Sequence, residues 1–365
     1  MRIAIVVTGG VDRSGRERVI PALISFIERQ ARRHEVVVYA LRYHERPCTY
    51  PLVGATVHDL GRPRGLRRQY GALVRALGRD GPFDVIHGYW ALPGGLTAAL
   101  AGRRLGIPSV VTLDSGEFIG DPAIEYGLQR LWRQRLAVRA TLRLASTLTV
   151  CTGHMRVLSR AHGVHPAVVP LGVDTTRFVP AQRPPGPPWR ILHAASLNPV
   201  KDQRTLLEAF RQVLSRVADV HLDIAGEDTL GGAIQHLARD LGIDRQVTFH
   251  GVQPTEALVS LYQRAHLFVL SSRHEAGAVV VLEAAACGVP TVGTAVGYLA
   301  DWTPDRAITV APRDPHALGD AIVGALSDPS RLTDIAAAAR AWTLAHDADW
   351  TARQFDRLYR ELAAT

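Results

Sequence analysis

The chain has 365 residues, of which 47% are hydrophobic, and it carries a net charge of +8 with a pI near 9.8. This length exceeds what one ordinary hydrophobic core holds, so it indicates two domains. No run of 18 apolar residues occurs, which excludes a membrane-spanning helix. The three cysteines are far apart, which argues against a disulfide framework and against a zinc site. We therefore expect a protein of the reducing cytoplasm.

Short apolar runs alternate with helical stretches along the first half of the chain. Predicted strands cover residues 3–7, 35–41, 55–60, 83–87, 108–113, 147–151 and 167–170. Predicted helices cover residues 18–32, 70–77, 96–105, 126–144 and 153–161. Strands that alternate with helices predict an α/β fold, with a parallel sheet covered on both faces.

The richest proline run, residues 180–188, cannot continue a helix or a central strand and is predicted to be a linker. After it, predicted strands cover residues 190–194, 221–225, 246–250, 267–270, 291–294 and 307–310. Predicted helices cover residues 202–213, 230–241, 255–264, 279–286, 315–326, 329–345 and 350–362. We thus expect a first domain over 1–179, a linker over 180–189 and a second domain over 190–345. A C-terminal helix in 346–365 is expected to pack back on the first domain.

Two predicted helices, within residues 62–79 and 130–143, hold much of the excess arginine. One interpretation is a pair of ordinary solvated helix faces. The other is a basic surface that meets an anionic substrate or anionic lipid, which would allow peripheral contact with the inner face of a membrane. Aromatic residues are only 6%, and no nucleic-acid-binding signature occurs, so no nucleic-acid partner is predicted.

The most informative stretch is Glu275-Ala-Gly-Ala-Val-Val-Val-Leu-Glu283. A strand ends before it and a helix is predicted to begin near Ala278, so the amides of Gly277, Ala278 and Val279 would be free at a helix start. Free amides and the helix dipole favour an anion such as a phosphate. Glu275 is suited to accept hydrogen bonds from sugar hydroxyls, and Glu283 from a ribose. The alternative is a capping glutamate beside an unrelated helix glutamate.

Lys201 is the only lysine among the 42 basic residues. Arginine has replaced lysine everywhere else, which suggests that this position needs a compact, flexible ammonium. An ordinary surface lysine is the alternative.

Several segments together resemble the retaining, two-domain GT-B glycosyltransferases of the glycogen-synthase-like family 4. They are the glutamate pair with the Ala, Gly and Pro that follow it, Pro170-Leu-Gly-Val-Asp174, Ser196-Leu-Asn-Pro-Val-Lys201-Asp202, Ala225-Gly-Glu227, Val247-Thr-Phe-His-Gly251 and Thr8-Gly-Gly10. The resemblance covers nearly the whole chain. It implies two Rossmann-like parallel-sheet domains that face a deep inter-domain cleft, with ligands beyond the carboxyl ends of the strands.

The resemblance also implies roles for single residues. Lys201 would contact the donor diphosphate and stabilise the leaving group, Glu275 would hold the transferred sugar, and Glu283 would hold the ribose. His250 and Gly251 would border the nucleobase through backbone groups. Gly9 and Gly10 would let the first loop approach the donor closely, although a plain strand-to-helix turn explains both glycines equally well.

Three positions depart from the family pattern. Ala276-Gly277-Ala278 stands where the family has Gly-Phe-Gly, and Ser196 stands in the diphosphate site where the family has arginine. Asp114 replaces the histidine of the first domain. An anionic Asp114 would disfavour a departing diphosphate unless it faces the acceptor, where it would orient or deprotonate a hydroxyl. Alternatively, Asp114 or Glu117 caps a helix.

The main hypothesis is transfer of a hexose-type sugar from a nucleoside diphosphate sugar to a hydroxyl, with retention of configuration and without a metal or a further cofactor. The acceptor stays open among a lipid-linked saccharide, a glycan and a small molecule. The rival hypotheses are a non-catalytic homologue that binds sugar nucleotides and a GT-B epimerase. A dehydrogenase is disfavoured because the first loop lacks the Gly-x-Gly-x-x-Gly spacing.

Overall fold

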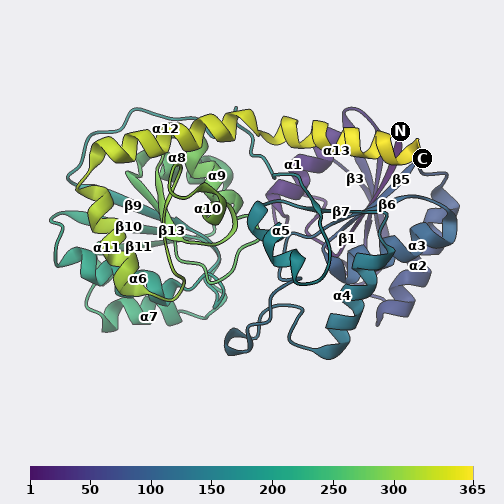
Figure 1. Cartoon of the computed structure of the whole chain (residues 1–365), viewed down its shortest axis with the longest axis horizontal. Coiled ribbons are helices and arrows are strands. Elements are labelled where there is room, and N and C mark those ends of the chain that lie inside the picture. Colours follow the sequence, from purple (N-terminus) through teal and green to yellow (C-terminus); the bar gives the residue numbers. More distant parts are fainter. Residues whose placement is uncertain (365) are drawn as a thin grey trace. The chain divides into compact units, whose positions relative to one another are not determined.

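The computed structural model describes residues 1–364, which form two compact units. The first unit contains Met1–Leu171 together with the C-terminal segment that begins at Ala348, and the second contains Gly172–Asp347. Each unit is an α/β layer structure with its own core (Figure 1). Among these residues, no helix is both long enough and apolar enough to cross a bilayer.

The first unit is built on an eight-stranded sheet in the order β3-β4-β2-β1-β5-β6-β7-β8. All neighbouring strands are parallel except β3 and β4. The strands are β1 (Arg2–Val7), β2 (Glu35–Ala40), β3 (Cys48–Leu52), β4 (Ala55–Asp59), β5 (Val85–Tyr89), β6 (Ser109–Thr112), β7 (Thr147–Val150) and β8 (Ala167–Val168). The helices are α1 (Pro21–Ala31), α2 (Leu66–Asp80), α3 (Leu96–Leu105), α4 (Trp132–Leu144), α5 (Gly153–Arg160) and α13 (Ala348–Ala363).

The second unit is built on a six-stranded parallel sheet in the order β11-β10-β9-β12-β13-β14. Its strands are β9 (Trp189–Ala194), β10 (Val220–Ala225), β11 (Val247–Gly251), β12 (Leu267–Leu270), β13 (Thr291–Thr294) and β14 (Ile308–Val310). Its helices are α6 (Gln203–Leu214), α7 (Ala233–Asp240), α8 (Thr255–Arg264), α9 (Val279–Ala286), α10 (Gly297–Trp302), α11 (Pro315–Leu326) and α12 (Pro329–Ala345).

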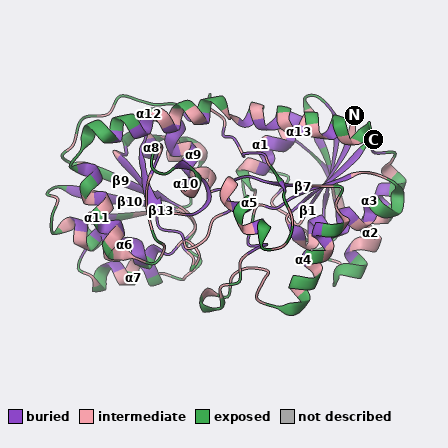
Figure 2. Ribbon diagram, viewed as in Figure 1, coloured by how far each residue is buried: buried purple, intermediate pink, exposed green. Residues whose placement is uncertain are grey.

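Both sheets are buried on their two faces, as Figure 2 shows. Successive side chains of a strand point to opposite faces, so each strand feeds two cores. In β1, Ile3 and Ile5 enter one cluster of buried residues and Ala4 and Val6 enter the other. This is why the strands are continuous apolar runs rather than alternating ones.

The C-terminal helix α13 packs against α1 of the first unit. Its Phe355 and Tyr359 are fully buried in the same core cluster as Ile3 and Phe26. Gln30 on α1 also donates a hydrogen bond to the carbonyl of Ala352, at 3.0 Å. The first unit therefore uses residues from both ends of the chain.

The boundary between the units lies at Leu171 and Gly172 rather than in the proline-rich segment 180–189. That segment belongs to the second unit because Arg183 donates hydrogen bonds to the carbonyls of Ala265 and Gly288. The sequence pattern of prolines indicated irregular backbone correctly, but it could not reveal which core that backbone packs against.

Three local predictions differ from the structure. Strand β3, which pairs antiparallel with β4 at the sheet edge, and the short helix α10 were not predicted. The helix predicted over 126–144 begins only at Trp132. The preceding residues form a turn in which Tyr126 and Asp121 exchange two backbone hydrogen bonds and Gly127 has a φ of 94°.

Candidate active site

Two loops that follow adjacent strands carry several of the predicted donor-binding residues, Ser196 and Lys201 on one loop and Glu275, Gly277 and Ala278 on the other. In the second sheet, β9 lies between β10 and β12, so the strand order reverses there. Ligands of open parallel sheets bind at such a point, beyond the carboxyl ends of the strands. The loop after β9 carries Lys201 and the loop after β12 carries Glu275, so the topology explains how residues far apart in the chain meet.

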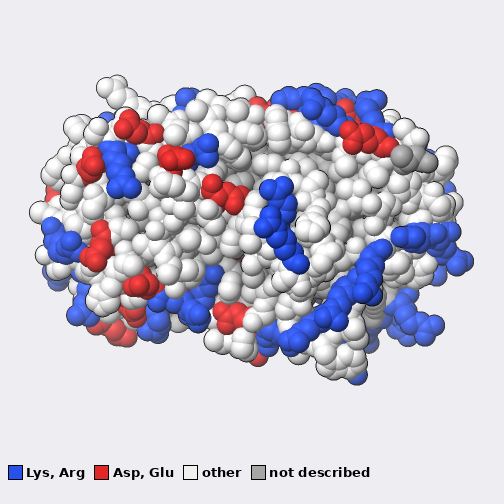
Figure 3. Space-filling model, viewed as in Figure 1, with Lys and Arg blue, Asp and Glu red and all other residues white. Residues whose placement is uncertain are grey.

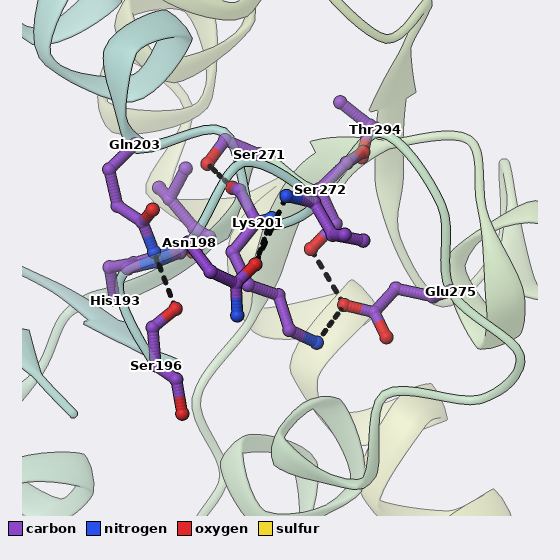
Figure 4. A network of polar contacts seen from close by, with 11 residues as sticks. His193, Ser196, Asn198, Lys201, Gln203, Ser271, Ser272, Glu275 and Thr294 are labelled. Carbon is purple, nitrogen blue, oxygen red and sulfur yellow. Dashed lines mark hydrogen bonds and ion pairs between the residues drawn. The ribbon is translucent and has the colours of Figure 1, made fainter. Parts of the chain in front are cut away.

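Lys201 and Glu275 form a direct ion pair (Figure 4). Lys201 Nζ lies 2.5 Å from Glu275 Oε1, and Ser272 Oγ donates to the same oxygen at 2.6 Å. Thr294 Oγ1 in turn donates to the carbonyl of Ser272 at 2.6 Å. The Glu275 side chain is 9% exposed and that of Lys201 is 26% exposed, so the pair is partly shielded from water. Charge-assisted hydrogen bonds of this kind are short and hold both side chains in place.

The loop that carries Lys201 is fixed by two amide side chains. Asn198 Oδ1 accepts hydrogen bonds from the backbone amides of Val200 and Lys201, at 3.0 and 3.1 Å. Gln203 donates to the carbonyl of Ser196 at 3.1 Å and lies 3.2 Å from His193 Nε2. The loop is therefore held from both sides of Lys201.

His193 completes this support from inside the core. It lies in β9, and burial lowers its pKa to about 4, so the ring is neutral at pH 7. Nδ1 lies 2.9 Å from the carbonyl of Val269, which can only accept, so Nδ1 carries the proton and Nε2 accepts from Gln203. This assignment ties the Lys201 loop to both β9 and β12.

Arg273 lies on the loop after β12 and contacts the loop that carries Lys201. Its backbone amide donates to the carbonyl of Val200 at 2.8 Å, and its Nε lies 3.0 Å from Asp202 Oδ2. Arg204 instead lies beside Glu208 on the exposed face of α6. The family has an arginine at the position of Ser196, and Arg273 is better placed than Arg204 to supply the missing positive charge. Asp202, however, already balances the charge of Arg273.

Helix α9 begins at Val279 with no side-chain cap. None of the described residues accepts a hydrogen bond from the amides of Gly277, Ala278 or Val279. Three amides at a helix start can bind an anion. Ala278 reaches this position only in the left-handed region, with φ 68°, where glycine is favoured.

Gly297 packs directly under this loop. A Cβ on Gly297 would lie 2.7 Å from the carbonyl oxygen of Gly277 and 3.0 Å from Glu275 Cβ, and its φ is +54°. The next residue, Tyr298, donates its amide to the Gly277 carbonyl at 3.1 Å. The start of α10 therefore supports the loop that presents Glu275.

Glu283 lies in α9, and its carboxylate meets the hydroxyl of a buried tyrosine. Tyr262 Oη donates to Glu283 Oε2 at 2.9 Å. Burial raises the pKa of Glu283 to about 7, although the hydrogen bond from Tyr262 opposes the increase. Glu283 therefore titrates near neutral pH, and its affinity for hydroxyl donors should depend on pH.

His250 and Gly251 end strand β11, and much of their hydrogen-bonding capacity is already used. His250 Nε2 lies 2.7 Å from Asp223 Oδ1. The carbonyl of His250 accepts from Gln253, and that of Gly251 accepts from the amide of Gly226. A ligand beside this strand end would have to contact the remaining backbone amides or carbon surfaces.

In the first unit, Asp114 lies just beyond the carboxyl end of β6, between the ends of β5 and β7. Cys151, after β7, hydrogen bonds to its carboxylate through both backbone and side chain. Oδ1 of Asp114 is buried without a partner, as is the hydroxyl of Tyr89 at the end of β5. Burial and the nearby Glu117 raise the pKa of Asp114 to about 7. These groups form a polar cluster that has unused hydrogen-bonding capacity.

Glu117 has a local structural role. Its Oε1 accepts from the amide of Ala91 at 3.2 Å, and its Oε2 accepts from the amide of Ser115 at 2.7 Å. Ala91 begins the helical turn Ala91–Gly95 before α3. Glu117 is therefore the residue that caps the start of the turn Ala91–Gly95. Asp114 instead bonds to Cys151 and keeps one oxygen unpartnered.

Gly9 and Gly10 follow β1, and protein side chains lie close to both. A Cβ on Gly9 would lie 2.9 Å from Tyr43 Cδ2, and one on Gly10 would lie 2.7 Å from Ile20 Cδ1. The amide of Ile20 also donates to the carbonyl of Gly10 at 3.0 Å. The packing of Tyr43 and Ile20 against these glycines, with the φ of +78° at Gly10, already accounts for both, so the donor contact expected for them stays a prediction.

Among residues 1–364, no group of three or more histidine, cysteine, aspartate or glutamate side chains is arranged to hold a metal ion.

Comparison with known proteins connects this geometry to a family. The profile of the family described as "Glycosyl transferases group 1" matches residues 174–342, and that described as "Glycosyl transferase 4-like domain" matches residues 25–172. The D-inositol 3-phosphate glycosyltransferase of Frankia alni is 30% identical over 77% of this chain and 74% of its own length. The chain belongs to the group 1 glycosyltransferases.

Other similar proteins agree with this assignment. A GDP-mannose-dependent monoacylated alpha-(1-6)-phosphatidylinositol monomannoside mannosyltransferase of Corynebacterium glutamicum is 28% identical over 72% of this chain and 71% of its own. Sucrose-phosphate synthase of Thermosynechococcus elongatus has the same fold, with a TM-score of 0.81 at 19% identity over the whole of both chains. HepE of Anabaena, solved with UDP-glucose, gives 0.77 at 18% identity over 99% of this chain and 100% of its own. The predicted GT-B fold is thus confirmed.

Within this glycosyltransferase, the structure brings Lys201 and Glu275 together in the second unit. Ser196 lies on the Lys201 loop, and the Glu275 loop leads into the start of α9. Glu283 lies further along α9. Asp114, Gly9 and Gly10 belong to the first unit. Sequence reasoning missed the supporting residues, which are Asn198, Gln203, Tyr262, Ser272, Thr294 and Gly297. Asn198 and Gln203 lie close to the only lysine in the sequence, and Asn198 also lies within the family-like segment Ser196–Asp202, so these were the available signals for them.

Proposed function

We propose that this glycosyltransferase transfers a hexose-type sugar from a nucleoside diphosphate sugar to a hydroxyl acceptor, with retention of configuration and without a metal or a further cofactor. The observation that carries the proposal is the contact of the Lys201 ammonium with the Glu275 carboxylate, on a loop that leads into the free amides at the start of α9. A cation and amides suit a diphosphate, and a carboxylate suits sugar hydroxyls.

The donor would exchange the ion pair for its own contacts. Lys201 would turn from Glu275 to the diphosphate, and Glu275 would accept hydrogen bonds from hydroxyls of the transferred sugar. The hydrogen bond from Ser272 Oγ would keep the Glu275 carboxylate in place. Glu283 would accept from the ribose, and the end of β11 at His250 and Gly251 would border the base. The charges of Lys201, Arg273, Asp202 and Glu275 sum to zero, so the α9 amides would contribute much of the attraction for the anion.

In the transfer step, the bond between the anomeric carbon and the diphosphate oxygen breaks, and a bond from that carbon to the acceptor oxygen forms on the same face. The acceptor proton passes to the departing phosphate oxygen, and Lys201 stabilises the negative charge that remains there. Asp114 would orient the acceptor hydroxyl through its unpartnered oxygen. No enzyme nucleophile is required in this scheme.

The names of the relatives suggest the first substrates to test. HepE was solved with UDP-glucose, and two relatives are named for inositol 3-phosphate and for GDP-mannose with a phosphatidylinositol mannoside. A thermal-shift panel of UDP- and GDP-sugars would identify the donor, because a ligand that binds only the folded state raises the melting temperature. Release of nucleoside diphosphate would then be measured with soluble inositol phosphates and with lipid-linked acceptors.

The products distinguish the competing hypotheses. A retained anomeric configuration in the product, measured by NMR, and full activity in the presence of EDTA support the proposal. Donor binding without nucleoside diphosphate release across all acceptors would favour the non-catalytic homologue, which the missing arginine at Ser196 makes a specific alternative. A changed donor sugar in the absence of any acceptor would indicate an epimerase.

A further inference from the structure

Helix α4 exposes a cluster of large apolar side chains where it begins. Trp132 is 64% exposed, and Leu131 and Leu136 are each 53% exposed. Trp132 and Leu136 lie one turn apart and therefore share a face. Within residues 1–364, no other six-residue stretch exposes three large apolar side chains. Single exposed apolar residues are ordinary, but a cluster of them marks an interaction surface.

This cluster is not the packing face of α4. The buried side of the helix carries Val138, Thr141 and Leu142, and Thr141 Oγ1 donates to the carbonyl of Ala91 at 3.1 Å. At 3.6 residues per turn, Trp132 and Leu136 point away from that buried side. The helix is therefore already anchored in the first unit, and its apolar cluster is left facing solvent.

Positive charge surrounds the cluster without acidic residues nearby in the sequence. Residues 126–173 contain seven arginines and no aspartate or glutamate. Helical spacing places Arg139 and Arg143 on the same face as Leu136, and the Arg133 guanidinium lies 5.3 Å from the centre of the Trp132 ring. None of the described carboxylates pairs with these three arginines. Figure 3 shows the resulting band of basic side chains along α4.

We propose that this exposed face of α4 docks on an anionic lipid bilayer. An indole ring and leucines gain free energy when they enter the boundary between headgroups and acyl chains. Arginine side chains extend along the apolar surface and keep their guanidinium groups at the lipid phosphates. The first unit would thus lie at the surface of the membrane, with no part of α4 crossing it.

The composition of the face favours lipid over the other polyanions. Nucleic-acid binding by stacking uses several aromatic side chains, whereas this face offers one aromatic ring and two aliphatic leucines. Aliphatic side chains add nothing to a phosphate contact, but they add apolar area that a bilayer can bury. The face therefore matches a surface that is apolar beneath a layer of negative charge.

Vesicle sedimentation of the full chain tests the proposal. The protein is expected to sediment with vesicles that contain phosphatidylglycerol and to remain in solution with vesicles of phosphatidylcholine alone. The double variant Trp132→Ser with Leu136→Ser should lose most binding at any salt concentration. The double variant Arg139→Gln with Arg143→Gln should weaken binding by roughly an order of magnitude at low salt, and the difference should shrink as salt is raised.

Matched controls separate this face from general effects of charge and apolarity. Arg353→Gln with Arg357→Gln makes the same charge change on exposed positions of α13, and Val252→Ser removes an apolar side chain that is 72% exposed in the second unit. Neither should change sedimentation. The thermal unfolding of each variant, measured without vesicles, reports on folding and keeps this test independent of the proposed reaction.

Three outcomes would overturn the proposal. The first is equal binding of wild type and the α4 variants to anionic vesicles. The second is tight binding to single-stranded RNA that survives the loss of Trp132 and Leu136. The third is a wild-type dimer in solution that the Trp132 and Leu136 variant converts to monomers, since that would assign the face to a second copy of the chain.

Discussion

Lys201 and Glu275 form an ion pair, so each balances the charge of the other, and this contact shapes how each would act. The ion pair keeps the ammonium at the end of β9, where it would otherwise be a mobile side chain with four rotatable bonds. It also fixes the orientation of the Glu275 carboxylate, which is only 9% exposed. The proposed donor would have to replace this contact on both sides, so the pair would favour ligands that bring an anion and hydroxyls together.

Replacing Lys201 by alanine tests the role of the ammonium. The variant should lower sugar transfer by about a hundred- to a thousand-fold, because one electrostatic stabiliser of the leaving group is lost. Steady-state rates of nucleoside diphosphate release measure this. Arg204→Ala, which removes a basic residue that faces Glu208 on α6, is the matched control and should change the rate little. Near-normal turnover in Lys201→Ala would contradict the assigned role.

The raised pKa of Glu283 predicts how donor affinity depends on pH. An ionised carboxylate accepts hydrogen bonds from ribose hydroxyls better than a protonated one does. Affinity should therefore rise as pH increases through about 7, where Glu283 loses its proton. Isothermal titration with the donor between pH 6 and 8 measures this, and Glu283→Gln, which cannot titrate, should bind weakly with a flatter profile.

Tyr262→Phe provides a second test of the same carboxylate. The hydrogen bond from Tyr262 favours the ionised form of Glu283, so its loss should move the midpoint of donor binding upward by about one pH unit. A purely structural role for Tyr262 would lower affinity equally at every pH. An unmoved midpoint would therefore separate Tyr262 from the donor site.

The role of Asp114 can be tested by comparing the rate of sugar transfer to the acceptor with the rate of donor hydrolysis by water. If its carboxylate orients the acceptor hydroxyl, Asp114→Asn should reduce transfer strongly and leave donor affinity and donor hydrolysis nearly unchanged. Because burial and Glu117 raise the pKa of Asp114 to about 7, transfer by the wild type should increase as pH rises through that value. Equal losses in donor binding and transfer would instead place Asp114 on the donor side or in the fold.

At the scale of the elements, helix α9 begins with uncapped backbone amides that directly follow a strained residue. Ala278 takes φ 68° immediately before the helix, a conformation that costs a residue with a Cβ about 1–2 kcal/mol. The strain lies in the loop that presents both Glu275 and the free amides. Gly297 and the amide of Tyr298 hold this loop from below, so the fold maintains the strained conformation.

Ala278→Gly should relieve this strain. Allowing for the larger entropy of the unfolded chain with glycine, the free energy of unfolding should rise by about 0.5–1 kcal/mol. Ala337→Gly, at an exposed interior position of α12, makes the same chemical change in a right-handed helix and should cost about 1 kcal/mol. Denaturant titration compares the two, and destabilisation by both substitutions would show that Ala278 is not strained.

At the scale of the whole molecule, two separate cores predict two unfolding events. The first core depends on α13, because Phe355 and Tyr359 are fully buried and Tyr359 Oη lies 2.6 Å from His87 Nδ1. Burial lowers the pKa of His87 to about 3, so this buried ring stays neutral. A chain that lost its C-terminal helix would therefore lose part of its N-terminal core.

Phe355→Ala should lower the unfolding temperature of the first unit, because it removes a buried aromatic ring at a cost of about 3–5 kcal/mol. The matched substitution Phe210→Ala should act on the second unit, where Phe210 is buried beside β9 and β10. Calorimetry with and without the nucleotide that the donor panel identifies assigns the transitions, since this ligand should raise only the second one. A single transition shifted alike by both variants would show that the units unfold together.

The sequence by itself determined the strand and helix alternation, the GT-B fold and the glycosyltransferase family, because these depend on local periodicity and on short motifs. It also singled out Lys201, since one lysine among 42 basic residues is visible without a structure. Residues 126–131 show the limit of such reasoning. Their composition suits a helix, but the backbone pairing of Tyr126 with Asp121 prevents one.

Only the tertiary structure decided which residues support the site. Lys201 and Glu275 lie 74 positions apart in the chain and meet because β9 and β12 are neighbours in the sheet. Tyr262 reaches Glu283 from another helix, and Phe355 enters a core formed mainly by the other end of the chain. Contacts of this kind depend on how elements pack in three dimensions, and neither the periodicity nor the spacing of residues along one segment contains that information.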